Sequence, residues 1–420
     1  MIKRIMYFLR SYKMSDAFFG LPSEVIFCKR CVISNQRPSS TVEFKHAKGE
    51  KKLTIGFAND GICDACHYQE TKAESIDWDA REVALVDLCN KYRRSDGSYD
   101  IIIPGSGGKD SAFTSHIMKY KYGMNPLTVT WAPHKYTDIG WKNFENWIHE
   151  GGLDNMLLTP NGRLHRYLTQ QAFVNLLHPF QPFIVGQRII GPSLAAKFGV
   201  ELVMYGENQA EYGNNLDDNY IPTMDTKFFS INDPLDIVLG GKKIREILEE
   251  TDFTLNDFAP YIPPSAEYLK SKNVEVHYLG YYLKWDPQEC YYYATEHTGF
   301  QSNTERTEGT YSKYSSIDDR IDMFHYYTTL VKFGIGRATY DAAQEIRNNK
   351  ITREEGSQLV RKFDEEFPKK YFKEFLEYIS LTEEQFHETV DKFRSPHLWE
   401  KDGDDWNLKS TVWHDQKRLD

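Results

Sequence analysis

Short apolar runs alternate along the middle of the chain with longer segments in which apolar residues recur at helical spacing. The apolar runs predict strands at 101–103, 127–131, 153–158 and 202–205, with a further strand within 274–283. The helical spacing predicts helices at 79–92, 138–150, 163–177 and 192–198, and one that ends near Tyr122. This alternation predicts an α/β fold with a parallel sheet covered on both faces.

The pattern changes towards both ends of the chain and divides it into three regions. Residues 1–75 hold four cysteines with Gly, Pro and Lys between them, and predict a small metal-bound module. Residues 76–317 carry the strand–helix alternation, but 207–270 are dominated by Asn, Asp, Gly and Pro, which predicts long active-site loops. Residues 318–420 read as mainly helical and include a capping-box pattern at 351–355.

Composition narrows the class of protein. The 420 residues carry a formal net charge of −10, which argues against strong nonspecific binding to nucleic acid. No apolar run reaches the roughly 18 residues of a membrane span, and the first residues lack the pattern of a secretory signal. We therefore expect a cytoplasmic protein without a membrane span.

A glycine-containing string follows the β-branched run 101–103 and precedes a helix. The string is Ser106-Gly107-Gly108-Lys109-Asp110-Ser111. Unpaired N–H groups and the helix dipole at such a helix start form an anion site, and the serine hydroxyls and Lys109 suit phosphate oxygens. Asp110 would repel phosphate, so we expect it to hold Mg²⁺ or to cap the loop. The string is not a Walker A loop, because Asp110 follows Lys109; the alternative is an ordinary strand–helix turn.

Four of the six cysteines form two CxxC pairs. These are Cys28, Cys31, Cys63 and Cys66. Two thiolate pairs suit a tetrahedral Zn²⁺ that is closed to substrate, so we expect a structural zinc site that holds a small module together. An iron–sulfur cluster or a redox dithiol is the rival interpretation.

A second polar loop, 206–213, follows the strand at 202–205. At the carboxyl edge of a parallel sheet such a loop lies near a ligand cleft. Glu207 and Glu211 are candidates to bind Mg²⁺ or to orient an attacking amine, and Asn208 and Gln209 to read a polar substrate. The alternative is a solvated polar turn.

The string Ser106–Ser111 resembles the SGGxDS signature of the PP-loop ATP pyrophosphatases. This resemblance implies a Rossmann-like fold of the adenine nucleotide α-hydrolase type, and cleavage of ATP between its α and β phosphates. It also implies that Ser106, Gly107, Gly108, Asp110 and Ser111 surround the pyrophosphate. The end of the second strand would lie near the adenosine, where Trp131 either stacks on adenine or belongs to the core.

The cysteine pairs, the phosphate string, the loop from Gly206 to Gln209 and the stretch 281–287 together resemble the N-acetyl sugar amidotransferases. These act in bacterial surface-polysaccharide and nonulosonic-acid pathways. The resemblance implies that the acetamido oxygen of a free, nucleotide-linked or CMP-linked sugar is adenylated, and that ammonia then displaces AMP. Cys89 and Cys290 lack a nucleophile signature, so ammonia is expected from a partner glutaminase, with a cyclase-like channel subunit as a further candidate partner.

Two alternatives remain at the level of sequence. A tRNA-modifying PP-loop enzyme of the thiolase type also pairs the phosphate loop with CxxC modules. A non-catalytic nucleotide-sensing subunit would keep the fold without the reaction. The aromatic run Tyr291-Tyr292-Tyr293 is a candidate sugar contact or a buried edge, and Arg306 a candidate anion ligand.

Overall fold

The fold centres on a parallel sheet of five strands, in the order β3-β2-β1-β4-β7. The computed structural model describes residues 17–39, 52–207 and 220–415. The strands are β1 (Ile101–Pro104), β2 (Pro126–Trp131), β3 (Asp154–Leu158), β4 (Leu202–Tyr205) and β7 (Glu275–Tyr278). All neighbouring strands run parallel. The predicted α/β class with a parallel sheet is confirmed.

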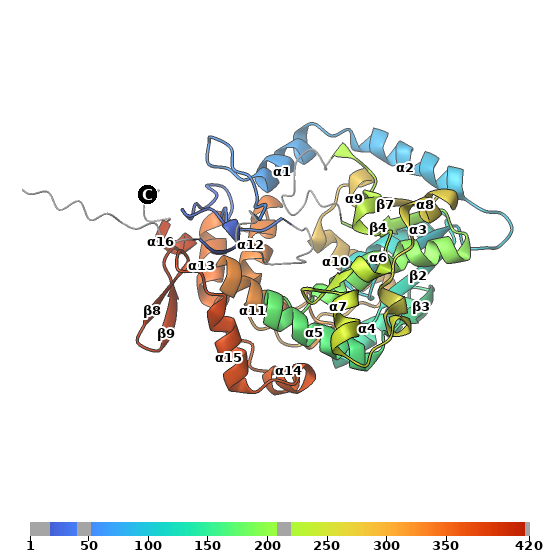
Figure 1. Ribbon diagram of the computed structural model, residues 1–420. Helices are drawn as coiled ribbons and strands as arrows, with labels where there is room; N and C mark the ends of the chain where they lie inside the picture. Colours follow the sequence, from blue (N-terminus) through green and yellow to red (C-terminus); the bar gives the residue numbers. More distant parts are fainter. Residues whose placement is uncertain (1–16, 40–51, 208–219, 416–420) are drawn as a thin grey trace, which may run out of the picture.

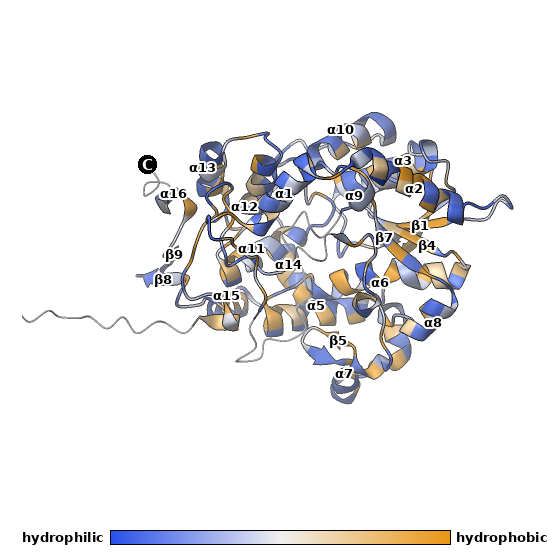
Figure 2. Ribbon diagram, turned by 90° about the horizontal axis from the view of Figure 1, so that it is seen from above, coloured by the Kyte–Doolittle hydropathy of each residue, from blue (hydrophilic) through white to orange (hydrophobic). Residues whose placement is uncertain are grey.

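Alternate residues of the central strands enter two different hydrophobic clusters. Ile102 and Val203 belong to the cluster on one face, whereas Ile101, Ile103 and Met204 belong to the cluster on the other. Both faces are buried, which explains why these strands read as continuous apolar runs. Figure 2 shows β1 and β4 as apolar strands between helices on either side. The covering helices are α2 (Trp78–Tyr92), α3 (Lys109–Tyr120), α9 (Leu279–Tyr282) and α10 (Pro287–Thr298) on one side, and α5 (Gly162–Leu176), α6 (Gln181–Phe198) and α8 (Ala266–Ser271) on the other.

One helix begins earlier than its sequence predicts. The expected helix at 192–198 is the last part of α6, which starts at Gln181 with Pro182 in its first turn. Pro192 lies inside this helix and not at its start. Among the described residues, every helix is too short or too polar to cross a lipid bilayer.

The segment 207–270 is more ordered than predicted where the structure describes it. It contains the hairpin β5 (Val238–Leu239) and β6 (Lys242–Lys243), the helix α7 (Ile244–Glu250) and α8. Phe229, Phe258 and Tyr261 of this segment are buried in the main cluster. These residues therefore cover one face of the sheet. The strand predicted within 274–283 ends at Tyr278, after which α9 begins.

The N-terminal cysteine module packs against the C-terminal helices (Figure 1). The helix of this module is α1 (Asp64–Glu74). In the central region, α4 (Asp138–His149) lies beside α10. Cys28, Cys63 and Ile55 share one hydrophobic cluster with Ala342 and Val360. The C-terminal elements are α11 (Asp322–Phe333), α12 (Arg337–Arg347), α13 (Arg353–Phe363), α14 (Phe372–Ile379), α15 (Glu383–Lys392), β8 (Trp399–Asp402), β9 (Asp405–Leu408) and α16 (Val412–Asp415).

Candidate nucleotide site and cysteine cluster

The predicted phosphate loop lies at the carboxyl end of β1, the central strand of the sheet. The sheet order changes direction between β1 and β4, and ligands of open α/β sheets bind at such a switch point. Gly108 is the N-cap of α3 and no side chain caps this helix start. Amide N–H groups of the first turn are therefore available to an anion.

Close packing holds the loop backbone against α3 and α4. Gly107 has φ +82°, and a Cβ there would lie 2.8 Å from Cα of Phe144. A Cβ on Gly105 would lie 2.2 Å from Cβ of Ser111. Only glycine fits both positions, so these two contacts explain part of the glycine pattern.

Lys109, Asp110 and Glu207 form one charged group at the start of α3. Nζ of Lys109 lies 2.5 Å from Oδ2 of Asp110. Burial alone would lower the pKa of Lys109, but the negative charges of Asp110 and Glu207 raise it above its usual value. Oδ1 of Asp110 is buried and has no hydrogen-bond partner among the described residues. A buried carboxylate oxygen without a donor suits a bound cation, so Asp110 fits the predicted Mg²⁺ ligand.

The two serines of the loop have different partners. The Ser111 hydroxyl donates to the carbonyl oxygen of Gly108 (3.0 Å). The Ser106 hydroxyl donates to Asp318, a carboxyl group whose pKa is raised by burial and by the neighbouring charge of Asp319. Asp318 is absent from the sequence prediction. No motif marks it, because it reaches the loop only through the packing of residues 317–319 against 134–140.

Glu207 lies next to the phosphate loop because Gly206 packs tightly. A Cβ on Gly206 would lie 2.8 Å from the indole of Trp285 and 2.9 Å from Oγ1 of Thr114 on α3. The amide of Gly280 also donates to the Gly206 carbonyl oxygen (2.8 Å). The candidates Asn208, Gln209 and Glu211 lie outside the described residues.

Trp131 is a core residue in this structure, with 2% of its surface exposed. Its ring meets Tyr261 edge to face, with centroids 5.0 Å apart. A Cβ on Gly186 of α6 would lie 2.2 Å from the indole, so the helix backbone covers the ring closely. This packing favours the core interpretation of Trp131 over adenine stacking.

The four cysteines of the two CxxC pairs meet in one buried cluster. Sγ of Cys28 lies 3.9 Å from Sγ of Cys66, and Sγ of Cys31 lies 3.8 Å from Sγ of Cys63. A tetrahedral ion with Zn–S bonds of about 2.3 Å separates its sulfur ligands by about 3.8 Å. All four sulfurs lie within 4.8 Å of one another. The cluster fits a single ion, whereas the thiolates of an iron–sulfur cubane bind different irons and stand further apart.

The C-terminal region contributes directly to the cysteine module. Nε of Arg353 on α13 donates to the carbonyl oxygens of Cys28 and Cys31, each at 3.2 Å. His67 pairs instead with Asp60 and Glu70 and is not part of the cluster. Bound metal would therefore fix the cysteine loops to which α13 is hydrogen bonded.

The surroundings of Cys89, Cys290 and Arg306 argue against a role in catalysis or in anion binding. Burial raises the pKa of Cys89 to about 11 and that of Cys290 well above its usual value, so both thiols stay protonated near neutral pH. Arg306 forms a two-pronged ion pair with Glu366 (2.6 and 2.7 Å), which occupies its guanidinium.

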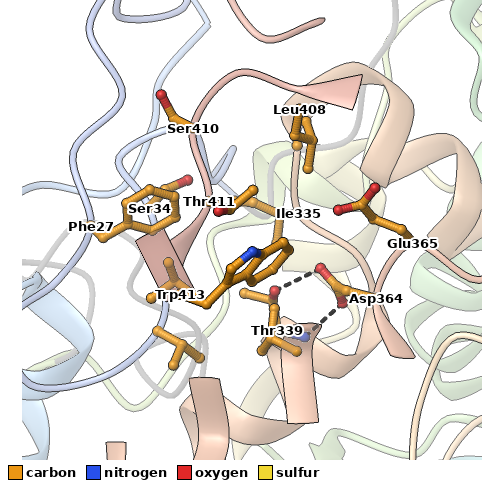
Figure 3. Close-up of a pocket in the computed structure, with 14 residues that line it drawn as sticks. Phe27, Ser34, Ile335, Thr339, Asp364, Glu365, Leu408, Ser410, Thr411 and Trp413 are labelled. Atoms are coloured by element: carbon orange, nitrogen blue, oxygen red, sulfur yellow. Dashed lines mark hydrogen bonds between the residues drawn. The ribbon is translucent and has the colours of Figure 1, made fainter. Parts of the chain in front are cut away.

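A pocket lies where the cysteine module, α12, α13 and the chain after β9 converge (Figure 3). It encloses about 330 Å³, open solvent included. Asp364 in its wall accepts hydrogen bonds from the amide and hydroxyl of Thr339 and from the amide of Gly336. Burial raises the pKa of Asp364 to about 6 despite these bonds. Because the Asp364 carboxylate caps the start of α12, we interpret this pocket as a packing gap between the cysteine module and the C-terminal helices and not as a ligand site.

Solved structures with detectable similarity include three whose TM-scores are low. NH3-dependent NAD synthetase from Campylobacter jejuni has a TM-score of 0.25 at 15% identity, over 31% of this chain and 56% of its own length. The U34-tRNA thiolase NcsA from Methanococcus maripaludis, solved with its 4Fe–4S cluster, has a TM-score of 0.29 at 14% identity, over 76% of this chain and 89% of its own length. NMN synthetase from Francisella tularensis has a TM-score of 0.26 at 12% identity, over 68% and 97%. The chain thus spans just over half the length of the NAD synthetase.

No curated protein matches the chain. Residues 308–412 match the family model of the C-terminal domain of WbpG-like LPS biosynthesis proteins. The match starts ten residues before the predicted boundary at 318, and covers α11 to β9. It agrees with the resemblance to surface-polysaccharide enzymes that the sequence motifs indicate. The C-terminal quarter of this chain is therefore similar to the WbpG-like C-terminal domain, and it follows an α/β region whose five-stranded parallel sheet carries the string Ser106–Ser111.

Proposed function

We propose that this protein is an ATP-dependent amidotransferase. It would adenylate the acetamido oxygen of an N-acetyl sugar and convert the group to an acetamidino group with ammonia, releasing AMP and pyrophosphate. The observation that carries the proposal is the loop Ser106–Ser111 at the switch point of the sheet, with an uncapped helix start and the buried, unpartnered Oδ1 of Asp110. The WbpG-like domain supports surface-glycan biosynthesis as the setting.

The residues of the loop bind the leaving pyrophosphate in this proposal. The amides at the start of α3 donate to its oxygens. Lys109 supplies a positive charge, because the nearby carboxylates of Asp110 and Glu207 keep its amino group protonated. Asp110 and Glu207 are the candidate Mg²⁺ ligands; an ion held by them would offset negative charge on the phosphates. The partner of Ser106, Asp318, fixes the direction of that hydroxyl.

The reaction then has two displacements. The acetamido oxygen attacks the α-phosphorus, the bond to pyrophosphate breaks, and an O-adenylyl imidate forms. Ammonia adds to the imidate carbon, the bond between this carbon and the former acetamido oxygen breaks, AMP leaves with that oxygen, and the nitrogen from ammonia loses a proton to give the amidine. Adenylation is needed because the amide oxygen is a poor leaving group whereas AMP is a good one.

Ammonia comes from outside this chain in the proposal. A glutaminase needs an activated thiol, and burial keeps the thiols of Cys89 and Cys290 protonated. A partner glutaminase, with or without a cyclase-like channel subunit, is the proposed source. The cysteine cluster has a structural role with Zn²⁺, because four thiolates leave no open position for substrate.

The test combines the protein with ATP, Mg²⁺ and ammonium, and adds free or nucleotide-linked acetamido sugars, or tRNA. Formation of AMP that requires both an acetamido sugar and ammonium is the expected result. AMP formation with tRNA alone would replace the proposal with a tRNA-modifying enzyme. ATP binding without turnover on any substrate would favour a nucleotide-sensing subunit.

A further inference from the structure

A second pocket lies between the start of α10, residues 312–315 and α12. It encloses about 360 Å³, open solvent included, and most of the residues that line it are of polar type. The carboxyl groups of Asp286, Asp341 and Glu345 line it, together with amide and hydroxyl side chains and Lys350. It is an open hollow at the surface, so a ligand there would be held by a few polar groups that fix its orientation and would remain partly in solvent.

The pocket is connected to the phosphate loop by a short stretch of chain. Ser315 lines the pocket, and Asp318, three residues later, accepts the hydrogen bond from Ser106. Three extended residues span about 10 Å at most. α10 also packs along α3, and its Cys290 lies within electrostatic reach of both Lys109 and Asp286. A ligand in the pocket therefore lies within a small molecule's length of the phosphate site.

The charges in the walls select against an anion. Lys350 lies 3.5 Å from Asp286, and Arg337 lies 3.1 Å from Asp341, so both cations are already paired. Glu345 accepts a hydrogen bond from the Tyr311 hydroxyl (2.8 Å). Carboxylates repel phosphate, and because each of the three already has a partner, they attract a cation only weakly; the walls therefore favour a neutral ligand rich in hydroxyls.

Three polar groups of the pocket remain available to such a ligand. The side-chain amide of Gln344 and the hydroxyls of Tyr314 and Ser315 have no hydrogen-bond partner within the described residues. The Tyr314 ring is held by stacking on Tyr291, with centroids 4.4 Å apart. The amide offers both a donor and an acceptor, which is what a sugar ring with adjacent hydroxyls requires.

We infer that this pocket binds the neutral sugar ring of the acceptor substrate, with Gln344, Tyr314 and Ser315 as its hydrogen-bonding residues. The inference rests on the proposed function for the identity of the substrate. A nucleotide or phosphate attached to the sugar would lie outside the pocket.

Two measurements test the inference on the full chain. Saturation-transfer NMR with N-acetylglucosamine as the probe reports binding without catalysis, and AMP formation reports KM for the sugar that supports turnover. Gln344→Ala combined with Tyr314→Phe is expected to weaken the NMR signal and to raise KM for the sugar about tenfold, with KM for ATP unchanged. Gln358→Ala, on the exposed side of α13, is the matched control and leaves both readouts unchanged.

The outcomes separate this inference from the proposed function. Sugar binding that depends on Gln344 and Tyr314, without AMP formation, would retain the pocket and overturn the proposed reaction. AMP formation that depends on an acetamido sugar but is unaffected by both substitutions would overturn the pocket alone. Displacement of the probe by excess uridine monophosphate would also contradict a neutral-sugar site.

Discussion

The hydroxyl of Tyr205, at the end of β4, donates a hydrogen bond to the carbonyl oxygen of Arg188 in α6 (2.9 Å). Pro192 follows Arg188 by four residues and has no N–H to donate to it, so the tyrosine supplies the missing donor. The helix thus continues through a proline because the sheet satisfies its free carbonyl. Tyr205→Phe is expected to lower the free energy of unfolding by about 1 kcal/mol, measured by urea denaturation.

Tyr220→Phe is the control for this substitution, because the Tyr220 side chain is exposed. The control is expected to leave stability unchanged. Equal stability of the Tyr205 variant and the wild type would show that water replaces the hydroxyl without cost.

The strands could be predicted from the sequence, but the start of α6 could not. Ile101–Ile103 and Leu202–Tyr205 are apolar because both faces of the sheet are covered. The first part of α6 buries Gln181, Phe183 and Ile189 alike, so it has no polar face and gives no helical stripe. In the sequence, Pro192 is typical of a helix start. Tyr205, which replaces the N–H that Pro192 lacks, belongs to another element, so no local pattern indicates it.

The strand–loop–helix form of residues 101–120 could be predicted because it is encoded locally. Its strand, glycines and helix follow one another directly in the sequence, and the structure places them as expected. The hydrogen bond between Ser106 and Asp318 joins residues of different regions and has no pattern in the sequence. The same is true of the approach of Arg353 to Cys28 and Cys31. Contacts between distant segments depend on packing, which periodicity does not encode.

Gly107 and Gly108 are adjacent in the loop but differ in what they tolerate. Gly107→Ala is expected to lower the free energy of unfolding by about 2–4 kcal/mol, because the residue has φ +82° and its Cβ would meet the backbone of Phe144. Gly108→Ala is the matched control, since a Cβ there meets only Oγ of Ser106 at 3.7 Å. Its cost is expected to stay below about 1 kcal/mol. A similar loss of stability in the two variants would contradict the packing described here.

Asp110 is the residue on which the proposed chemistry depends most. Asp110→Asn keeps the shape of the side chain. It removes the negative charge beside Lys109 and with it the charged, unpartnered Oδ1 that would bind a cation. AMP formation is expected to fall about 100-fold or more, with folding and the zinc content of the cysteine cluster unchanged. Asp79→Asn, in the first turn of α2, is the control because Asp79 is exposed. Retained activity in the Asp110 variant would remove this residue from the proposed site.

The cysteine cluster predicts one bound ion per chain. Cys31→Ala is expected to abolish stoichiometric metal, measured by mass spectrometry of the purified protein, because three sulfurs no longer close the site. The variant is also expected to increase hydrogen exchange in α13, since Arg353 binds the carbonyl oxygens of Cys28 and Cys31. Cys290→Ala removes a buried thiol outside the cluster and should keep the metal. Stoichiometric iron together with inorganic sulfide would show that the four cysteines bind an iron–sulfur cluster and not zinc.

Asp364 gives the C-terminal domain a dependence on pH whose direction follows from its pKa. Burial raises this pKa from 3.8 to about 6 in the folded protein, so the folded state holds the proton more tightly than the unfolded chain. The stability contributed by this proton is complete below pH 4 and is lost as the pH rises through 6.

Asp364→Asn removes this titration, so the stability of the wild type relative to the variant should fall by about 2.5 kcal/mol between pH 4 and pH 7. Urea denaturation across this range measures the difference. The absolute stability of the variant is expected to be lower at every pH, because an amide offers one acceptor where Thr339 and Gly336 donate three hydrogen bonds. Glu354→Gln, at an exposed position of α13, is the control. A difference between wild type and Asp364→Asn that does not change with pH would mean that the carboxylate stays ionised, held by its three donors against the cost of burial.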